Sequence, residues 1–173
     1  MKKVLIILTA IATGSTAMAA SIGLGTKEVS LAGSLTMETP MGTDFAINLG
    51  YGYAVADNVV VGGIFGLQDN DVNTVFDIGG YGEFNFETAT EWMPYVGGRL
   101  TWTSSDPDSE FVDGVDALVL KPYGGLKYFF SDSVAAYAEF GWSLASDDVY
   151  VGDNLEAEST NYGILLGLRV YLP

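Results

Sequence analysis

Long stretches of this chain alternate between large apolar residues and small or polar ones, and this period of two most constrains its fold. Between Phe45 and Val55 the odd-numbered positions are large and apolar, and the even-numbered ones are Ala, Asn or Gly. The segment from Val134 to Ala145 alternates in the same way. Successive side chains of a strand point to opposite faces, so the pattern predicts β-strands with two chemically different faces.

Eight segments share this alternation, each ten to fourteen residues long. Strands of soluble proteins usually have about five or six residues, whereas a tilted strand needs about 9–11 to cross a bilayer. Tight connections alternate with longer ones, which is typical of transmembrane barrels. We therefore predict an all-β, eight-stranded, antiparallel up-and-down transmembrane β-barrel, with strands at residues 28–38, 45–55, 59–68, 74–86, 92–103, 117–130, 134–145 and 160–172.

The first twenty residues are predicted to be a cleavable signal peptide, and residues 21–173 the barrel domain. Lys2 and Lys3 precede an apolar run from Val4 to Ala12, and Ala17-Met18-Ala19 fits the small-residue rule for cleavage. The apolar run is shorter than the roughly 20 residues of a spanning helix. We expect export and a location in the bacterial outer membrane.

The composition excludes several kinds of chemistry. The chain has no Cys and no His, which removes thiol chemistry, the commonest general base and the commonest metal ligand. Without Lys2 and Lys3, five basic residues remain against 22 acidic ones, a charge that repels nucleic acid. We expect no enzyme activity, no cofactor and no nucleic-acid partner, while cations and basic partners remain open.

The two faces allow either a lipocalin-like soluble barrel with an apolar cavity or a membrane barrel with a polar interior. The polar face favours the membrane barrel, because its charges are few, balanced in sign and set among small residues, as a narrow filled lumen requires. Four of the five remaining basic residues lie on it. The predicted lumen charge network is Glu28, Asp77, Glu83, Arg99, Lys121, Lys127, Glu139 and Arg169.

Aromatic residues of the apolar face are sorted by depth, near the strand ends and away from the middle. Two aromatic girdles around an aliphatic band are what the two membrane interfaces select. The girdle residues that we single out are Phe84, Phe86, Trp92 and Tyr128 at the short-turn end, and Trp102, Trp142 and Tyr162 at the long-loop end.

Pairing neighbouring strands about each turn predicts which lumen charges meet. Arg99 is expected diagonally from Asp77, and Lys127 diagonally from Glu139. Closure of the last strand on the first brings Arg169 near Glu28, which leaves Lys121 and Glu83 to reach across or to bind water. A salt-bridge plug is one interpretation and an ion pathway the other; eight strands enclose just enough room for side chains, which favours the plug.

Two segments carry related short motifs: residues 94–98 read P-Y-x-G-G and residues 122–125 read P-Y-G-G. The last strand has apolar residues at alternate positions up to the C-terminus. In these features the chain resembles the small OmpA/OmpX-type outer-membrane β-barrel proteins, and the last strand is similar to the signal that this family presents to its barrel-assembly machinery. The family typically ends on Phe, whereas Leu172 and Pro173 close this chain. The resemblance implies a monomer embedded in outer-membrane lipid.

Most acidic residues fall at the long-loop rim, where we expect the protein's interactions. Residues 106–110 begin like a calcium loop, but Phe111 stands where the turn needs Gly and the closing Glu is missing. Weak divalent-cation binding by clustered carboxylates is a separate hypothesis. The predicted function is a membrane anchor or structural component that presents acidic loops for surface interaction; the alternative is a narrow ion or small-solute channel. The rim residues are Asp69, Asp71, Asp106, Asp108, Glu110, Asp113, Asp116, Asp147, Asp148, Asp153, Glu156 and Glu158.

Overall fold

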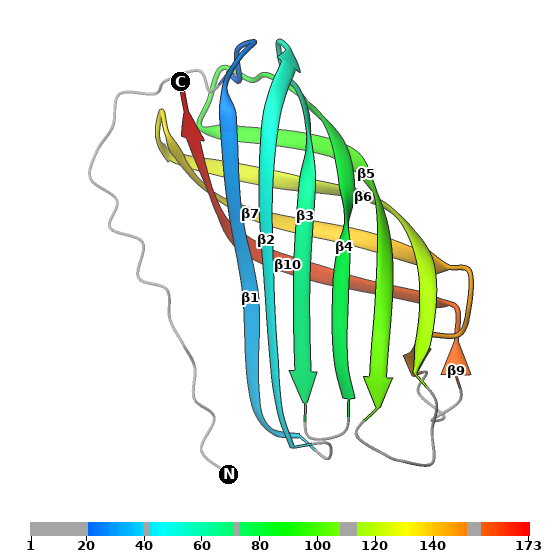
Figure 1. Ribbon diagram of the computed structural model, residues 1–173. Coiled ribbons are helices and arrows are strands. Elements are labelled where there is room, and N and C mark those ends of the chain that lie inside the picture. Colours follow the sequence, from blue (N-terminus) through cyan, green and yellow to red (C-terminus); the bar gives the residue numbers. More distant parts are fainter. Residues whose placement is uncertain (1–20, 40–41, 71–72, 108–113, 152–156) are drawn as a thin grey trace.

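The computed structural model describes residues 21–39, 42–70, 73–107, 114–151 and 157–173. Eight long strands close into one antiparallel barrel in the order β1-β10-β7-β6-β5-β4-β3-β2 (Figure 1). Among the described residues, no helix is long and apolar enough to cross a membrane. The barrel strands are β1 (Lys27–Thr39), β2 (Gly42–Ala56), β3 (Val59–Asn70), β4 (Asn73–Asn85), β5 (Trp92–Pro107), β6 (Val115–Ser131), β7 (Val134–Ala145) and β10 (Thr160–Leu172).

All eight predicted strands are confirmed, most with ends shifted by a few residues. The two-residue strands β8 (Tyr150–Val151) and β9 (Ala157–Glu158) form a separate small hairpin that the sequence did not predict. They lie inside the predicted loop between β7 and β10. Two residues are too short to show an alternation, so the pattern that revealed the barrel strands could not reveal these.

The apolar face points outward and the polar face inward, as predicted for the membrane barrel. On β1, Val29 and Leu31 are exposed, whereas Glu28, the residue before Val29, is buried. On β7, Phe140 and Trp142 are exposed and Glu139 is buried. An outer surface of exposed Leu, Val, Ile and aromatic side chains suits hydrocarbon and not water.

The P-Y-x-G-G and P-Y-G-G segments lie opposite each other on β5 and β6, and their tyrosines point into the barrel. In the β5–β6 ladder Tyr95 lies opposite Gly125, and Tyr123 lies opposite Gly97. A β-carbon added to Gly125 would come within 2.6 Å of the Tyr95 ring and hydroxyl, and one added to Gly97 equally close to Tyr123. The two rings meet edge to face with centroids 6.1 Å apart. Each glycine therefore leaves room for the tyrosine of the neighbouring strand.

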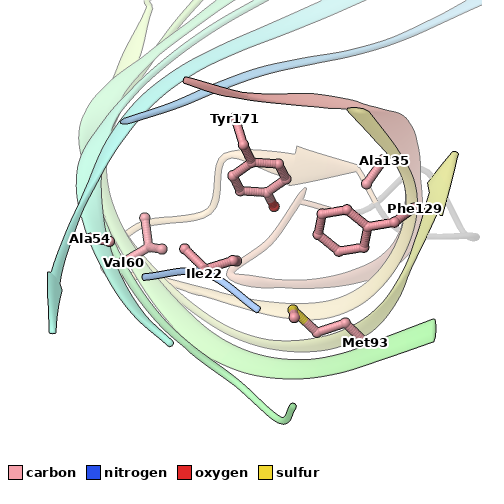
Figure 2. Packing of buried hydrophobic residues seen from close by; sticks show 7 residues of the cluster. All are labelled: Ile22, Ala54, Val60, Met93, Phe129, Ala135 and Tyr171. Atoms are coloured by element: carbon pink, nitrogen blue, oxygen red, sulfur yellow. The ribbon is translucent and has the colours of Figure 1, made fainter. Parts of the chain in front are cut away.

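Residues 21–26 fold across the short-turn mouth of the barrel. Asn58, in the β2–β3 turn with a left-handed φ of 62°, donates its backbone N–H to the Ile22 carbonyl over 2.7 Å. Ile22 N–H returns a bond to Asn58 Oδ1 over 3.2 Å. These bonds hold the Ile22 side chain, only 2% exposed, inside an apolar layer (Figure 2) with Ala54, Val60, Met93, Phe129, Ala135 and Tyr171.

The seam that closes the barrel is shorter than the other ladders. On β1, residues 27–32 pair with residues 172–167 of β10, and the pairing ends there although both strands continue. β1 pairs with β2 along nearly its whole length. In Figure 1, β1 and β10 meet near the C-terminus and run apart toward the long-loop end.

Candidate functional site

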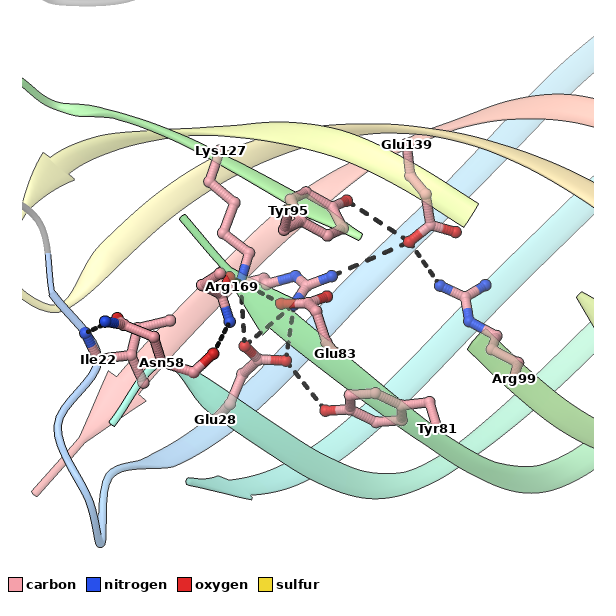
Figure 3. Close-up of polar contacts among 11 residues, drawn as sticks. Ile22, Glu28, Asn58, Tyr81, Glu83, Tyr95, Arg99, Lys127, Glu139 and Arg169 are labelled. Atoms are coloured by element: carbon pink, nitrogen blue, oxygen red, sulfur yellow. Dashed lines mark hydrogen bonds and ion pairs between the residues drawn. The ribbon is translucent and has the colours of Figure 1, made fainter. Parts of the chain in front are cut away.

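The inward-facing charges of six strands meet in one cluster inside the barrel (Figure 3). We call it the ion cluster. Each member is in the inward phase of its strand, so the alternation that faces apolar residues to the outside also places these charges in the lumen. Its members are Glu28 of β1, Glu83 of β4, Arg99 of β5, Lys127 of β6, Glu139 of β7 and Arg169 of β10.

The half of the ion cluster nearer the short turns is the more densely paired. Lys127 Nζ lies 2.5 Å from Glu83 Oε1 and 3.7 Å from Glu28 Oε2. Arg169 Nη1 lies 3.0 Å from Glu28 Oε1 and 2.9 Å from Glu83 Oε2. Lys127 also donates to Asn85 Oδ1 over 2.6 Å. Two carboxylates and two cations thus alternate in space, so each charge has opposite charges as its nearest neighbours.

The contact between Arg169 and Glu83 crosses the barrel. Strand β10 is separated from β4 by β7, β6 and β5 on one side and by β1, β2 and β3 on the other. Their side chains nevertheless meet at 2.9 Å. The ion cluster therefore bridges opposite walls and does not line one of them.

The rest of the ion cluster lies around Glu139. Arg99 Nη2 is 2.7 Å from Glu139 Oε2, and Arg169 Nη2 is 4.0 Å from the same oxygen. Tyr95 donates its hydroxyl to Glu139 Oε2 over 3.5 Å, and Tyr81 donates to Glu28 Oε1 over 3.0 Å. Three carboxylates face three basic groups, and the cluster carries no net formal charge.

Tyrosine rings complete the packing of the cations. The Arg169 guanidinium lies 4.6 Å from the Tyr137 ring centroid and 4.9 Å from that of Tyr95. Arg99 lies 4.7 Å from the Tyr123 ring centroid. Such contacts add an attraction to the face of the ring. Sequence reasoning did not assign these tyrosines to the site, although the alternation puts Tyr95 in phase with Arg99.

Two of the predicted pairings are wrong. Arg99 bonds Glu139 and not Asp77, and Lys127 bonds Glu83 and not Glu139. The prediction considered only adjacent strands, but long side chains in a narrow lumen reach strands that are not neighbours. Asp77 instead accepts a hydrogen bond from Thr103. The expected meeting of Arg169 with Glu28 is present.

Lys121 and Asp77 lie apart from the ion cluster, nearer the long loops. Among the described residues, no carboxylate lies within 4 Å of the Lys121 ammonium. The predicted site residues therefore separate into six that form one network, one half-buried lysine without an ion pair, and one aspartate bonded to a threonine.

A small cavity adjoins the ion cluster. Its volume is about 10 Å³, which is room for one water molecule. Polar groups of Glu28, Ser30, Asn48 and Arg99 are among its lining, so a bound water would find hydrogen-bond partners there.

The predicted girdle residues all lie on the outer surface, and several pack together. Phe84 and Phe86 meet edge to face at 5.0 Å, and Trp92 packs on Tyr128 at 4.7 Å. At the other end, Trp102, Trp142 and Tyr162 are exposed. Phe140, which was not among the named girdle residues, lies 6.5 Å from Tyr162.

The acidic rim is described in part. Asp69, Asp106, Asp116, Asp147, Asp148 and Glu158 are all exposed. The predicted rim residues Asp71, Asp108, Glu110, Asp113, Asp153 and Glu156 lie outside the described residues. Within the described part of the chain, no group of three or more acidic residues is arranged to hold a metal ion.

Comparison with known proteins bears on the barrel as a whole. The chain is similar to the barrel domain of Pseudomonas aeruginosa OprF (TM-score 0.62, 16% identity, 87% of this chain and 100% of that one). It is also similar to neisserial surface protein A, NspA (TM-score 0.58, 17% identity, 87% and 98%). A designed transmembrane β-barrel matches with a TM-score of 0.51, 16% identity and coverage of 88% and 99%.

The chain has the fold of a small outer-membrane β-barrel. No family model and no curated protein sequence matches it. At 16–17% identity the outer-membrane neighbours share its architecture, and the residues of the ion cluster have to be understood from this chain alone. A function for this chain therefore has to agree with two observations: the fold of an outer-membrane barrel and an interior of paired charges.

Proposed function

We propose that this chain is a monomeric protein of the bacterial outer membrane whose lumen is closed, and that it anchors acidic loops at the cell surface. The observation that carries the closed lumen is the Arg169–Glu83 ion pair, which joins opposite walls. The apolar layer around Ile22 lies between the ion cluster and the short-turn mouth and supports the same conclusion. On this proposal the work of the protein is done at its surface.

Planar-bilayer recording of the refolded full chain tests the closed lumen. We expect no steady single-channel steps, because a permeating ion would have to separate a buried Glu–Arg pair. The alternative function, a narrow ion or small-solute channel, has the cavity beside Glu28 and Arg99 in its favour. Regular conductance steps that change when Arg169 is replaced would establish the channel and overturn the plug.

The proposed location rests on the outward apolar face. Such a large apolar surface is unfavourable in water and needs a membrane or another protein to cover it. Fractionation of cells is the direct test: we expect the protein in the outer-membrane fraction, and we expect it to migrate differently on gels before and after heating.

Membership of the OmpA/OmpX-type family and assembly through the C-terminal strand are part of the proposal. We also propose that residues 1–20 are a removed signal peptide; mass spectrometry of the purified protein would show a chain that starts near Ser21.

The proposed surface role rests on charge. Acidic residues far outnumber basic ones outside the lumen. If residues 1–20 are removed, Lys27 is the basic residue that remains there. Weak binding of Ca²⁺ or Mg²⁺ by the loops belongs to the proposal; absence of heat in calorimetric titration at millimolar Ca²⁺ would remove it. The proposal assigns no catalytic activity, since without His the chain lacks the residue that barrel hydrolases of this kind would need.

A further inference from the structure

The barrel wall is incomplete between β1 and β10 in its long-loop half. Pairing between these strands ends at Ala32 and Gly167, yet β1 continues to Thr39 and β10 begins at Thr160. Within the described residues, the facing backbone edges of 33–39 and 160–166 are therefore unpaired with each other. In a bilayer such a gap is unusual, because hydrocarbon offers no hydrogen bonds to a strand edge.

Side chains beside this gap are unusually exposed. Tyr162 and Ile164 are each 74% exposed and Leu166 61%, whereas the outward apolar residues of the other described strands reach at most 56%. A groove of about 430 Å³ lies at the point where the two strands separate. It is an open groove on the outer face, one of several, and its lining includes outward Leu31, Leu166 and Leu168 beside the last paired residues Ala32 and Gly167.

Behind the gap, the inward positions of β10 and β7 that lie beside Lys121 are both glycines. The Lys121 side chain crosses Gly141 of β7, where an added β-carbon would collide with Lys121 Cε. Gly141 is paired with Gly163 of β10, at the unpaired part of that strand. A β-carbon on Gly163 would meet nothing within 4 Å. No side chain of these two positions thus separates the lysine from the gap.

Lys121 also lacks the partner that the other lumen cations have. Arg99, Lys127 and Arg169 each bind a carboxylate within 3.0 Å, whereas Lys121 has none within 4 Å among the described residues. Two other inward carboxylates already have partners, since Glu139 binds Arg99 and Asp77 accepts a hydrogen bond from Thr103. An anionic group would complete this site by charge.

We propose that the gap between β1 and β10 is a lateral binding site for a long-chain fatty acid. The apolar groove receives the tail from the bilayer, and Lys121 binds the carboxylate. Lateral entry fits the charges, because the exposed acidic residues at the long-loop mouth repel an anion that approaches from water. The ion cluster blocks the lumen further in, so the site holds the ligand and does not pass it through the barrel.

The test is a titration of the full chain, reconstituted in phosphatidylcholine nanodiscs, with hexadecanoate labelled with ¹³C at the carboxyl carbon. Saturable binding that shifts the carboxyl resonance is expected. Lys121→Gln should weaken it about tenfold or more, since the charge-assisted contact is lost, and Lys121→Arg should retain most of it. Gly163→Leu, which fills the path, should also weaken it at least tenfold.

Matched controls separate the site from general effects on charge and shape. Lys27→Gln removes a cation at the short-turn end, and Gly98→Leu adds a side chain at another glycine with open space around it; both should bind as the wild type does. Heat-modifiable gel migration shows that each variant is folded. Absence of saturable binding, or equal affinity in Lys121→Gln and the wild type, overturns the proposal.

The unpaired edge of β10 could instead be covered by a second copy of the chain. Cross-linking in nanodiscs that joins β10 of two copies, with no hexadecanoate binding, would overturn the fatty-acid site and assign the gap to an oligomer. Absence of hexadecanoate binding, with or without cross-linking, is distinguishable from failure of the proposed closed lumen. The closed lumen is tested by bilayer conductance, which is measured without fatty acid and reports on the ion cluster.

Discussion

The two halves of the lumen are built on different principles. The short-turn half is filled: Lys127 and Glu139 are at most 1% exposed, and the apolar layer of Ile22 lies between the ion cluster and the mouth. The long-loop half holds Lys121 without an ion pair among the described residues, and its wall is open between β1 and β10. One barrel thus combines a half in which the lumen charges are paired with a half in which a lysine and two strand edges are left without partners among the described residues.

Glu83→Gln should have the largest effect on stability, because Glu83 contacts both Lys127 and Arg169. Leaving buried cations without their carboxylate typically costs about 3–5 kcal/mol. Urea unfolding in phospholipid vesicles measures the change. The control is Glu87→Gln, an exposed turn residue, which should shift the unfolding free energy by less than about 0.5 kcal/mol. Equal effects of the two variants would contradict the claim that buried ion pairs stabilise the short-turn half of the lumen.

Ile22→Ala should follow, with a loss of about 2–4 kcal/mol, since the side chain is buried in the apolar layer and its removal leaves a cavity. Leu24→Ala is the matched control, because Leu24 is two residues away and 67% exposed. The same unfolding assay applies. A loss no larger than that of the control would show that residues 21–26 do not hold the mouth closed in the membrane.

Gly125→Ala should destabilise the barrel by about 1–3 kcal/mol, since the new methyl group overlaps the Tyr95 ring. Gly98→Ala adds the same group on the outer face, where nothing lies within 4 Å, and should change stability by less than about 0.5 kcal/mol. Adding Tyr95→Phe to Gly125→Ala should recover part of the loss, because the hydroxyl lies 2.6 Å from the added β-carbon, beside the still closer Ala138 carbonyl oxygen that the double variant leaves in place.

Lys121→Gln should have the smallest effect, less than about 0.5 kcal/mol, because no ion pair is broken. Glu83→Gln and Lys121→Gln both neutralise a charge in the lumen, the first in the filled half and the second in the open half. A loss above about 2 kcal/mol for Lys121→Gln, measured in the same vesicles, would show that the long-loop half is also tightly packed.

The sequence predicted the barrel and its inner and outer faces because both follow from alternation, which is a local property. The pairing of charges inside the barrel is not local. Arg169 meets Glu83 across the lumen because the barrel is narrow, and strand order alone does not give that distance. Reasoning from adjacent strands correctly paired Arg169 with Glu28 and failed for Arg99 and Lys127.

Two further features escaped prediction for related reasons. Ile22 is a single apolar residue before the first strand, with no periodicity around it to mark it as buried. The gap between β1 and β10 depends on the relative shift of strands at opposite ends of the chain. Each of these strands alternates well by itself, so neither carries a sign that their pairing stops at Ala32 and Gly167.

The ion cluster has a consequence for how the protein is made. Its six charges come from strands that span the chain from β1 to β10, and Arg169 arrives on the last of them. Until that strand is in place, Glu28 and Glu83 have one shared cation between them, Lys127. An unfinished barrel therefore keeps an uncompensated negative charge in a narrow space, and completion removes it. Electrical neutrality of the interior is therefore reached only when the first and last strands have joined.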